Sequence, residues 1–137
     1  MTLDEFVARA GSVQFKEHGR DWDGWDCFGL VYCFYREVRG VIVPDYLTAY
    51  ENTLDKGPIN AAVNDGIKRW TRVEKPVPGD GVLLSCARRP VHMGLIISAR
   101  DFLHTEVKIN TVVEDFTSLL WQRRVLGFYR YEGSSCV

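Results

Sequence analysis

The spacing of apolar residues changes along the chain, from a helical period near the start to alternation in the second half. Over 3–10, and again from Cys27 to Gly40, apolar residues recur three and four positions apart, as on helices that bury one face. After residue 80 the period becomes two, which predicts strands over 81–86, 91–98, 101–107, 109–114 and 124–131. Helices followed by strands predict an α+β fold, with N-terminal helices packed on a central antiparallel sheet.

Local signals mark the ends of these helices. Thr2 and Glu5 have the spacing of a capping box, in which each side chain accepts from the other residue's backbone amide. Gly11 and Gly40 follow the two helical segments, where glycine commonly ends a helix. Both helices are therefore predicted from local sequence alone.

The remaining segments have weaker patterns. Residues 12–26 are rich in Gly, Asp and His and are predicted to form a loop. Residues 58–70 are compatible with a helix that carries Pro58 in its first turn. The segment 115–122 predicts a short helix capped by Asp115.

Length and charge limit the class of protein. The chain has 137 residues, 46% of them hydrophobic, which predicts a single domain over 1–137 with its own core. A net charge of −1 argues against a nucleic-acid partner. No apolar run approaches the roughly 18 residues of a transmembrane helix, so we expect no stable membrane insertion. The first eleven residues lack the apolar segment of a secretion signal, which favours synthesis in the cytoplasm without export by that route.

Four cysteines lie at positions 27, 33, 86 and 136 without a C-x-x-C pair, and the three histidines lack zinc-finger spacing. We therefore expect neither a metal site nor a cofactor. Cys33 lies inside an apolar helical run and is predicted to be a core residue, whereas Cys27 stands at the entrance of that run.

The position of Cys27 at a predicted helix start favours a reactive thiol. The first turn of a helix has amides without intrahelical acceptors and a partial positive charge. Cysteine pKa values in such places fall from roughly 8.5 into the range of about 3.5–7.5. Cys27 is therefore a candidate nucleophile, and its backbone N–H is a candidate donor to an oxyanion. The alternative at this point is a small buried residue without chemistry.

Two histidines provide a candidate base. His92 and His104 lie on consecutive predicted strands, and a hairpin centred on Ser98 would place them directly opposite one another. One imidazole can then act as base while the other accepts its ring N–H and orients it, as in a catalytic triad. Glu106 shares a strand face with His104, which makes it either a hydrogen-bond partner of that ring or a solvated acid.

The segments "GWDCFGLV", "VPGDGVLL", "HMGLII" and "FLHTE" resemble, in this order, the NlpC-type cell-wall cysteine peptidases. The loop "HGRDWDGWDC" and the segment "GVIVPDY" resemble the branch found in bacteriophage tail-assembly and tail-tip proteins. The resemblance implies a papain-like fold with Cys27 as nucleophile, His92 as general base and His104 as its orienting partner. It also implies peptidoglycan stem peptide as the substrate, cut after a γ-linked D-glutamyl residue, with other tail-tip proteins as partners and the virion tail as location.

The same resemblance assigns roles around the nucleophile. Asp26 matches the family acid before the cysteine and would bind the free amine of the peptide. Phe15 and Phe28 stand where family enzymes commonly have tyrosine and serine, so two hydroxyl groups near the cleft are replaced by phenyl rings.

Other side chains near these motifs have two interpretations each. Trp22 and Trp25 flank the candidate site and either line a groove for substrate or simply pack in the core. Arg88 and Arg89 either meet carboxylates of a stem peptide or lie in a solvated turn.

Three functions fit these observations. The first is a thiol hydrolase that uses Cys27, His92 and His104. The second is a catalytically weak or inactive structural component of a tail tip, which the loss of the two hydroxyls favours. The third, a lipid acyltransferase of the same architecture, ranks last because the sequence has no amphipathic or transmembrane anchor.

Overall fold

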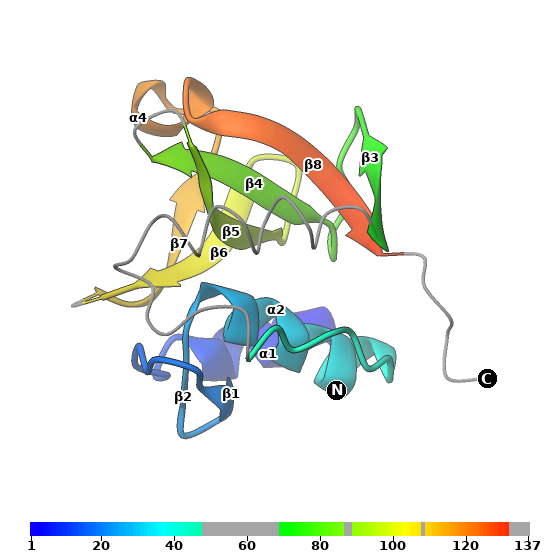
Figure 1. Ribbon diagram of the computed structural model, residues 1–137, viewed down its shortest axis with the longest axis vertical. Coiled ribbons are helices and arrows are strands. Elements are labelled where there is room, and N and C mark those ends of the chain that lie inside the picture. Colours follow the sequence, from blue (N-terminus) through cyan, green and yellow to red (C-terminus); the bar gives the residue numbers. More distant parts are fainter. Residues whose placement is uncertain (48–68, 87–88, 108, 132–137) are drawn as a thin grey trace.

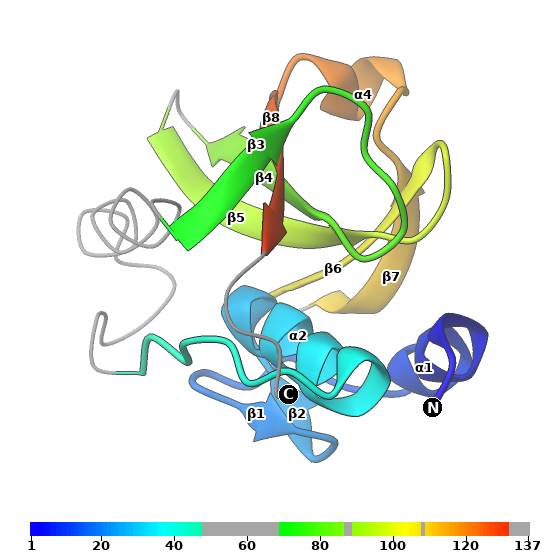
Figure 2. The same cartoon turned by 90° about the vertical axis from the view of Figure 1, so that its right-hand side faces the viewer.

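The computed structural model describes residues 1–47, 69–86, 89–107 and 109–131. Within these ranges an N-terminal group of helices lies on one side of a six-stranded sheet (Figures 1 and 2). The predicted α+β fold is confirmed. The helix predicted over 58–70 lies outside the described residues except for its last two positions.

Helix α1 (Leu3–Ala10) begins as its sequence predicts. The Thr2 hydroxyl accepts from the amide of Glu5, and the Glu5 carboxylate accepts from the amide of Thr2. Phe6 and Ala10 are the buried positions, so the helix packs through one face.

Helix α2 (Cys27–Phe34) is buried along almost its whole length. It continues as a π-helical turn, η1 (Tyr35–Arg39), and ends at Gly40, whose φ of 66° is the left-handed conformation that glycine adopts without strain. The Tyr35 hydroxyl donates to the carbonyl oxygen of Gly79 at 2.6 Å, which ties this turn to the loop that joins residues 73 and 81, two strand ends of the large sheet. No helix in the described part of the chain is long and apolar enough to cross a membrane.

The large sheet is antiparallel and has the strand order β3-β8-β4-β5-β6-β7. Its strands are β3 (Trp70–Val73), β4 (Gly81–Cys86), β5 (Arg89–Ile96), β6 (Asp101–Glu106), β7 (Ile109–Asp115) and β8 (Val125–Tyr131). The strands from β4 to β7 follow one another as the sequence predicts. The last strand, β8, lies between β3 and β4, so the sheet is not a simple meander. A small hairpin of β1 (Arg20–Asp21) and β2 (Gly24–Trp25) occupies part of the segment predicted as loop.

Apolar side chains cover both faces of this sheet. One cluster joins the N-terminal helices to the sheet and includes Phe6, Leu30, Phe34, Leu83, Met93, Leu95 and Leu103. A second cluster holds residues of alternate strand positions together with the segment around α4 (Leu119–Gln122), namely Val82, Leu84, Ile96, Phe102, Phe116 and Trp121. This arrangement follows the period of two, because successive residues of a strand point to opposite faces.

Two local predictions need correction. Helix α4 begins after Ser118 rather than at Asp115. Oδ1 of Asp115 instead accepts from the amide and the hydroxyl of Thr117, at 2.8 and 2.6 Å, so this carboxylate stabilises the turn before the helix. Strand β3 was not predicted, because its four residues carry little alternation of their own and its pairing partner, β8, lies about 55 residues later in the sequence.

Candidate active site

The β5–β6 hairpin brings the two histidines onto one face with a different register from the predicted one. Leu95 is paired with Leu103 and Ile96 with Phe102, so the turn is centred on Ala99 and not on Ser98. The Ser98 hydroxyl accepts from the amide of Asp101, which helps to set this turn. The prediction that His92 and His104 lie directly opposite one another was therefore wrong.

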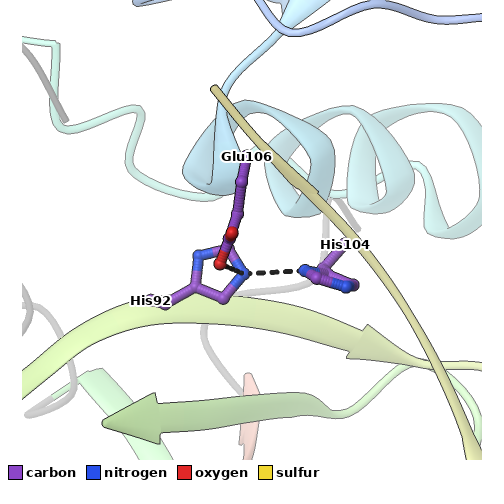
Figure 3. A group of neighbouring side chains, drawn as sticks. All are labelled: His92, His104 and Glu106. Atoms are coloured by element: carbon purple, nitrogen blue, oxygen red, sulfur yellow. Dashed lines mark hydrogen bonds and ion pairs between the residues drawn. The ribbon is translucent and has the colours of Figure 1, made fainter. Parts of the chain in front are cut away.

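The shift moves each partner by two residues, and an even shift keeps every side chain on its original face. His92 and His104 are consequently diagonal neighbours. Nε2 of His92 lies 3.0 Å from Nδ1 of His104, and the two rings are nearly perpendicular, at 76° (Figure 3). His92 is 6% exposed and His104 is 1% exposed, so their hydrogen bond is shielded from water.

Glu114 extends this pair across a third strand. Its Oε2 atom lies 2.5 Å from Nε2 of His104. In the β6–β7 ladder His104 is opposite Val112 and Phe102 is opposite Glu114, so the carboxylate and the imidazole are again diagonal neighbours. Sequence reasoning missed Glu114. The available signal was weak: Glu114 follows two valines on the strand after His104, but Asp115 directly follows it, so the sequence does not single out one acid.

These contacts determine which ring nitrogens carry hydrogen. An ionised carboxylate only accepts hydrogen bonds, so Nε2 of His104 donates to Glu114. Nδ1 of neutral His104 is then an acceptor, and Nε2 of His92 must donate to it. This leaves the basic lone pair of His92 on Nδ1, which Figure 3 shows on the side of the ring facing α2. His92 is therefore in the tautomer that a general base needs.

Glu106 contacts His92, whereas its place on the strand had suggested His104 as its partner. Its Oε1 atom lies 3.6 Å from Nε2 of His92, and the side chain is 38% exposed (Figure 3). Extending the observed register places position 106 opposite position 92, which explains the contact. A carboxylate here stabilises His92 when the ring is protonated.

Cys27 is the first residue of α2, as predicted. Helix α2 packs against β5 and β6, and Cys27 belongs to the same buried cluster as Met93 and Leu103, the chain neighbours of the two histidines. The thiol residue is 4% exposed. The fold thus places the start of a helix and a hydrogen-bonded pair of imidazoles in adjoining layers.

Asp26 supports the start of α2 from within the protein. Its Oδ1 atom accepts from the amide of Gly29 at 2.9 Å and from the guanidinium of Arg20 at 2.8 Å, and Oδ2 accepts from the amide of His18 at 3.0 Å. The residue has no exposed surface. In this structure Asp26 is the N-cap of α2 and an ion-pair partner, and its carboxylate does not reach a surface where a peptide amine could bind.

The aromatic residues named from the sequence lie in or near the core. Trp25 is fully buried, stacks on Phe6, and donates from its indole nitrogen to the Thr111 hydroxyl at 2.8 Å. Its place is that of a core residue rather than of a groove wall. Phe28 is buried, with its ring centroid 6.1 Å from that of Tyr46. Phe15 is partly buried and pairs through its backbone with Trp25.

Arg89 and Cys33 were also considered in the sequence analysis. Arg89 is the first residue of β5, and its side chain lies outside the described part of the structure. Cys33, on the same helix as Cys27, is completely buried, and this burial raises the pKa of its thiol to about 11. Cys33 is therefore a protonated core residue near neutral pH.

Comparisons with known proteins agree with this architecture. Among solved structures, an NLP/P60 family protein from Staphylococcus aureus subsp. aureus Mu50, described as similar to a lipoprotein, matches with a TM-score of 0.66 and 20% identity, over 94% of this chain and 39% of that one. An NlpC/P60 family protein from Bacillus cereus ATCC 10987 matches with a TM-score of 0.66 and 17% identity, over 96% and 40%. The chain thus spans about two fifths of the length of these two proteins.

The NlpC/p60 domain of the peptidoglycan hydrolase SagA matches over nearly its whole length, with a TM-score of 0.59, 15% identity, and coverage of 94% of this chain and 98% of that domain. No curated protein matches the sequence. The model of the NlpC/P60 family matches residues 12–130, a range that includes the helix headed by Cys27 and all six strands up to Arg130. By this match, the chain belongs to the NlpC/P60 family.

Proposed function

We propose that the protein is a cysteine endopeptidase that cleaves an amide bond in peptidoglycan stem peptides, of the γ-D-glutamyl-diamino acid type. The observation that carries the proposal is the series of hydrogen bonds from Glu114 through His104 to His92, beside the helix that begins at Cys27. Family membership and the fold shared with a peptidoglycan hydrolase domain support the substrate class.

In the proposed reaction, Nδ1 of His92 takes the proton of the Cys27 thiol, and the thiolate attacks the amide carbonyl carbon. The carbonyl oxygen becomes an oxyanion, to which first-turn amides of α2 such as that of Cys27 donate. The tetrahedral intermediate collapses, the C–N bond breaks, and protonated His92 gives its proton to the leaving amine.

A thioester with Cys27 remains after the first half of the reaction. His92 then takes a proton from a water molecule, whose oxygen attacks the thioester carbonyl and releases the carboxylic acid together with the Cys27 thiol. His104 and Glu114 keep the His92 ring in one tautomer throughout, and Glu106 favours its protonated form.

The test is hydrolysis of purified muropeptides under reducing conditions, followed by mass spectrometry. We expect new fragments with the wild type and none with Cys27→Ala. Cys33→Ala is the matched control, because it removes a thiol from the same helix and leaves the nucleophile in place. Absence of fragments with the wild type, or equal cleavage by Cys27→Ala, contradicts the proposal.

We place this activity in a bacteriophage tail, where it would open the cell wall locally during entry. The support is the resemblance of the loop at 18–27 and the segment at 40–46 to tail-tip proteins. The second candidate, a structural tail component with little or no activity, is favoured by the phenyl rings of Phe15 and Phe28 in place of family hydroxyls and by the low exposure of Cys27. A phage that carries Cys27→Ala separates the two: slower entry with normal assembly supports the peptidase, whereas normal entry and assembly support the structural component.

A further inference from the structure

Three side chains at the candidate site present metal-binding atoms to one another. One donor atom from each of His92, His104 and Glu106 lies within 4.8 Å of the other two (Figure 3). Nε2 of His92 is 3.0 Å from Nδ1 of His104 and 3.6 Å from Oε1 of Glu106. Two imidazole nitrogens and one carboxylate oxygen form a donor set that binds Zn²⁺ in catalytic zinc sites.

Two of the three spacings between these atoms are close to the spacing around a zinc ion, and the third, from His104 to Glu106, is no more than 4.8 Å. Two ligand atoms at roughly 2.0–2.1 Å from a tetrahedral metal lie about 3.3 Å apart. The two distances from His92, 3.0 and 3.6 Å, fall on either side of this value. Movement of the Glu106 side chain, which is 38% exposed, toward His104 would bring the three atoms to the spacing of zinc ligands.

The surroundings of His104 provide a second, independent observation. A histidine that binds metal through one nitrogen commonly donates its other ring N–H to a carboxylate, which orients the ring and makes the ligand more basic. His104 has this arrangement, because its Nε2 donates to Glu114 while Nδ1 faces Nε2 of His92. The rings of Phe102 and Trp121, with centroids 4.8 and 5.0 Å from that of His104, hold the imidazole in place.

We propose that His92, His104 and Glu106 bind a divalent transition-metal ion such as Zn²⁺, and that this metal inhibits the thiol chemistry. The metal would take the lone pairs of His92 Nε2 and His104 Nδ1. The hydrogen of neutral His92 then moves from Nε2 to Nδ1, so that the nitrogen facing α2 no longer accepts a proton. The binding step does not depend on the proposed peptidase activity, whereas the inhibition rests on it.

A linear motif does not reveal this site. The ligands lie on two strands and meet through the hairpin register, so no finger-like spacing marks them in the sequence. The sequence alone therefore led us to expect no metal site. The ion proposed here is an inhibitor and not a resident cofactor.

The test is a calorimetric titration of the chelator-treated full chain with Zn²⁺, in the Cys27→Ala background, so that the thiol contributes nothing. We expect one ion bound per chain, about tenfold weaker binding after Glu106→Gln, and a loss of 10–100-fold after Glu114→Gln, as for other outer-shell carboxylates. Glu74→Gln is the matched control, since Glu74 is exposed and lies outside the three-residue group. Replacing His92 by alanine should abolish the binding.

No Zn²⁺ binding to Cys27→Ala overturns the proposal, as does binding that Glu106→Gln and His92→Ala leave unchanged, because the ion would then lie elsewhere. Hydrolysis by the wild type provides the second readout: Zn²⁺ should stop it, and a chelator should restore it. Activity that persists when the site is saturated overturns the inhibitory role.

Discussion

His92 and His104 are joined through Nε2 and Nδ1 although they lie two residues out of register, and the same offset separates His104 from Glu114. The three side chains therefore form a diagonal line across β5, β6 and β7 (Figure 3 shows its first two members). Because each hydrogen bond determines the next tautomer, the carboxylate at one end controls which nitrogen of His92 is basic at the other.

Removing the Glu114 carboxylate should slow catalysis without weakening substrate binding. A hydrogen bond to a charged group contributes about 1.5–3 kcal/mol, which corresponds to roughly a 10–100-fold lower kcat for Glu114→Ala. KM should stay within about twofold, since Glu114 reaches the substrate only through two imidazoles. Glu114→Gln should recover part of the lost rate, because its amide oxygen still accepts from His104. Wild-type kinetics in Glu114→Ala would contradict the relay.

The two described thiols on α2 should differ in their rate of alkylation. Cys33 is completely buried, and burial raises the pKa of its thiol to about 11, so it remains protonated and unreactive at pH 7. Cys27 lies at the helix start next to the histidine layer and should react first with iodoacetamide, as followed by peptide mass spectrometry. Equal and slow labelling of both residues would contradict a catalytic role for Cys27.

Asp26→Asn tests whether this carboxylate stabilises the protein or binds substrate. Asparagine still caps a helix, but the partly buried guanidinium of Arg20 loses the charge of its fully buried partner. Breaking a buried pair costs about 3 kcal/mol of unfolding free energy, measurable by denaturant titration. The control Asp23→Asn changes an exposed acid in the same loop and should stay within about 0.5 kcal/mol. A raised KM with unchanged stability would instead support binding of the peptide amine.

Tyr35 should make the stability of the fold sensitive to alkaline pH. Burial raises the pKa of its hydroxyl to about 12, while the same group in the unfolded chain ionises near 10. The hydroxyl therefore stays protonated to higher pH in the folded state than in the unfolded chain. Its contribution to the free energy of unfolding is complete below pH 10 and is lost as pH rises toward 12. Between neutral pH and pH 11, the free energy of unfolding of the wild type should fall by roughly 1 kcal/mol more than that of Tyr35→Phe. Parallel pH profiles for the two proteins would contradict this linkage.

The features that were predicted correctly depend on neighbouring residues. The Thr2–Glu5 capping box, the glycine at the end of η1 and the start of α2 at Cys27 are each encoded within a few positions. The shared face of His92 and His104 was also predicted correctly, because the observed register differs from the predicted one by two residues and an even shift keeps each side chain on its face.

The features that were missed depend on pairing between distant segments. The insertion of β8 between β3 and β4 leaves no local signal, since strand propensity does not specify a partner. Glu114 became recognisable as a partner of His104 only when the β6–β7 register was known. Asp26 directly precedes the cysteine in the sequence, yet its contacts with His18 and Arg20 come from the folding of the preceding loop.

The position of β8 inside the sheet, between β3 and β4, has a consequence for how the site is assembled. Residues 125–131 are synthesised after every residue of the histidine relay, and until they are in place β4 has one unpaired edge and β3 has no neighbour in the described sheet. A ribosome-bound chain that ends before β8 thus carries the thiol and both imidazoles on an incomplete scaffold. Synthesis of β8, rather than the appearance of the reactive groups, therefore completes the sheet that supports them.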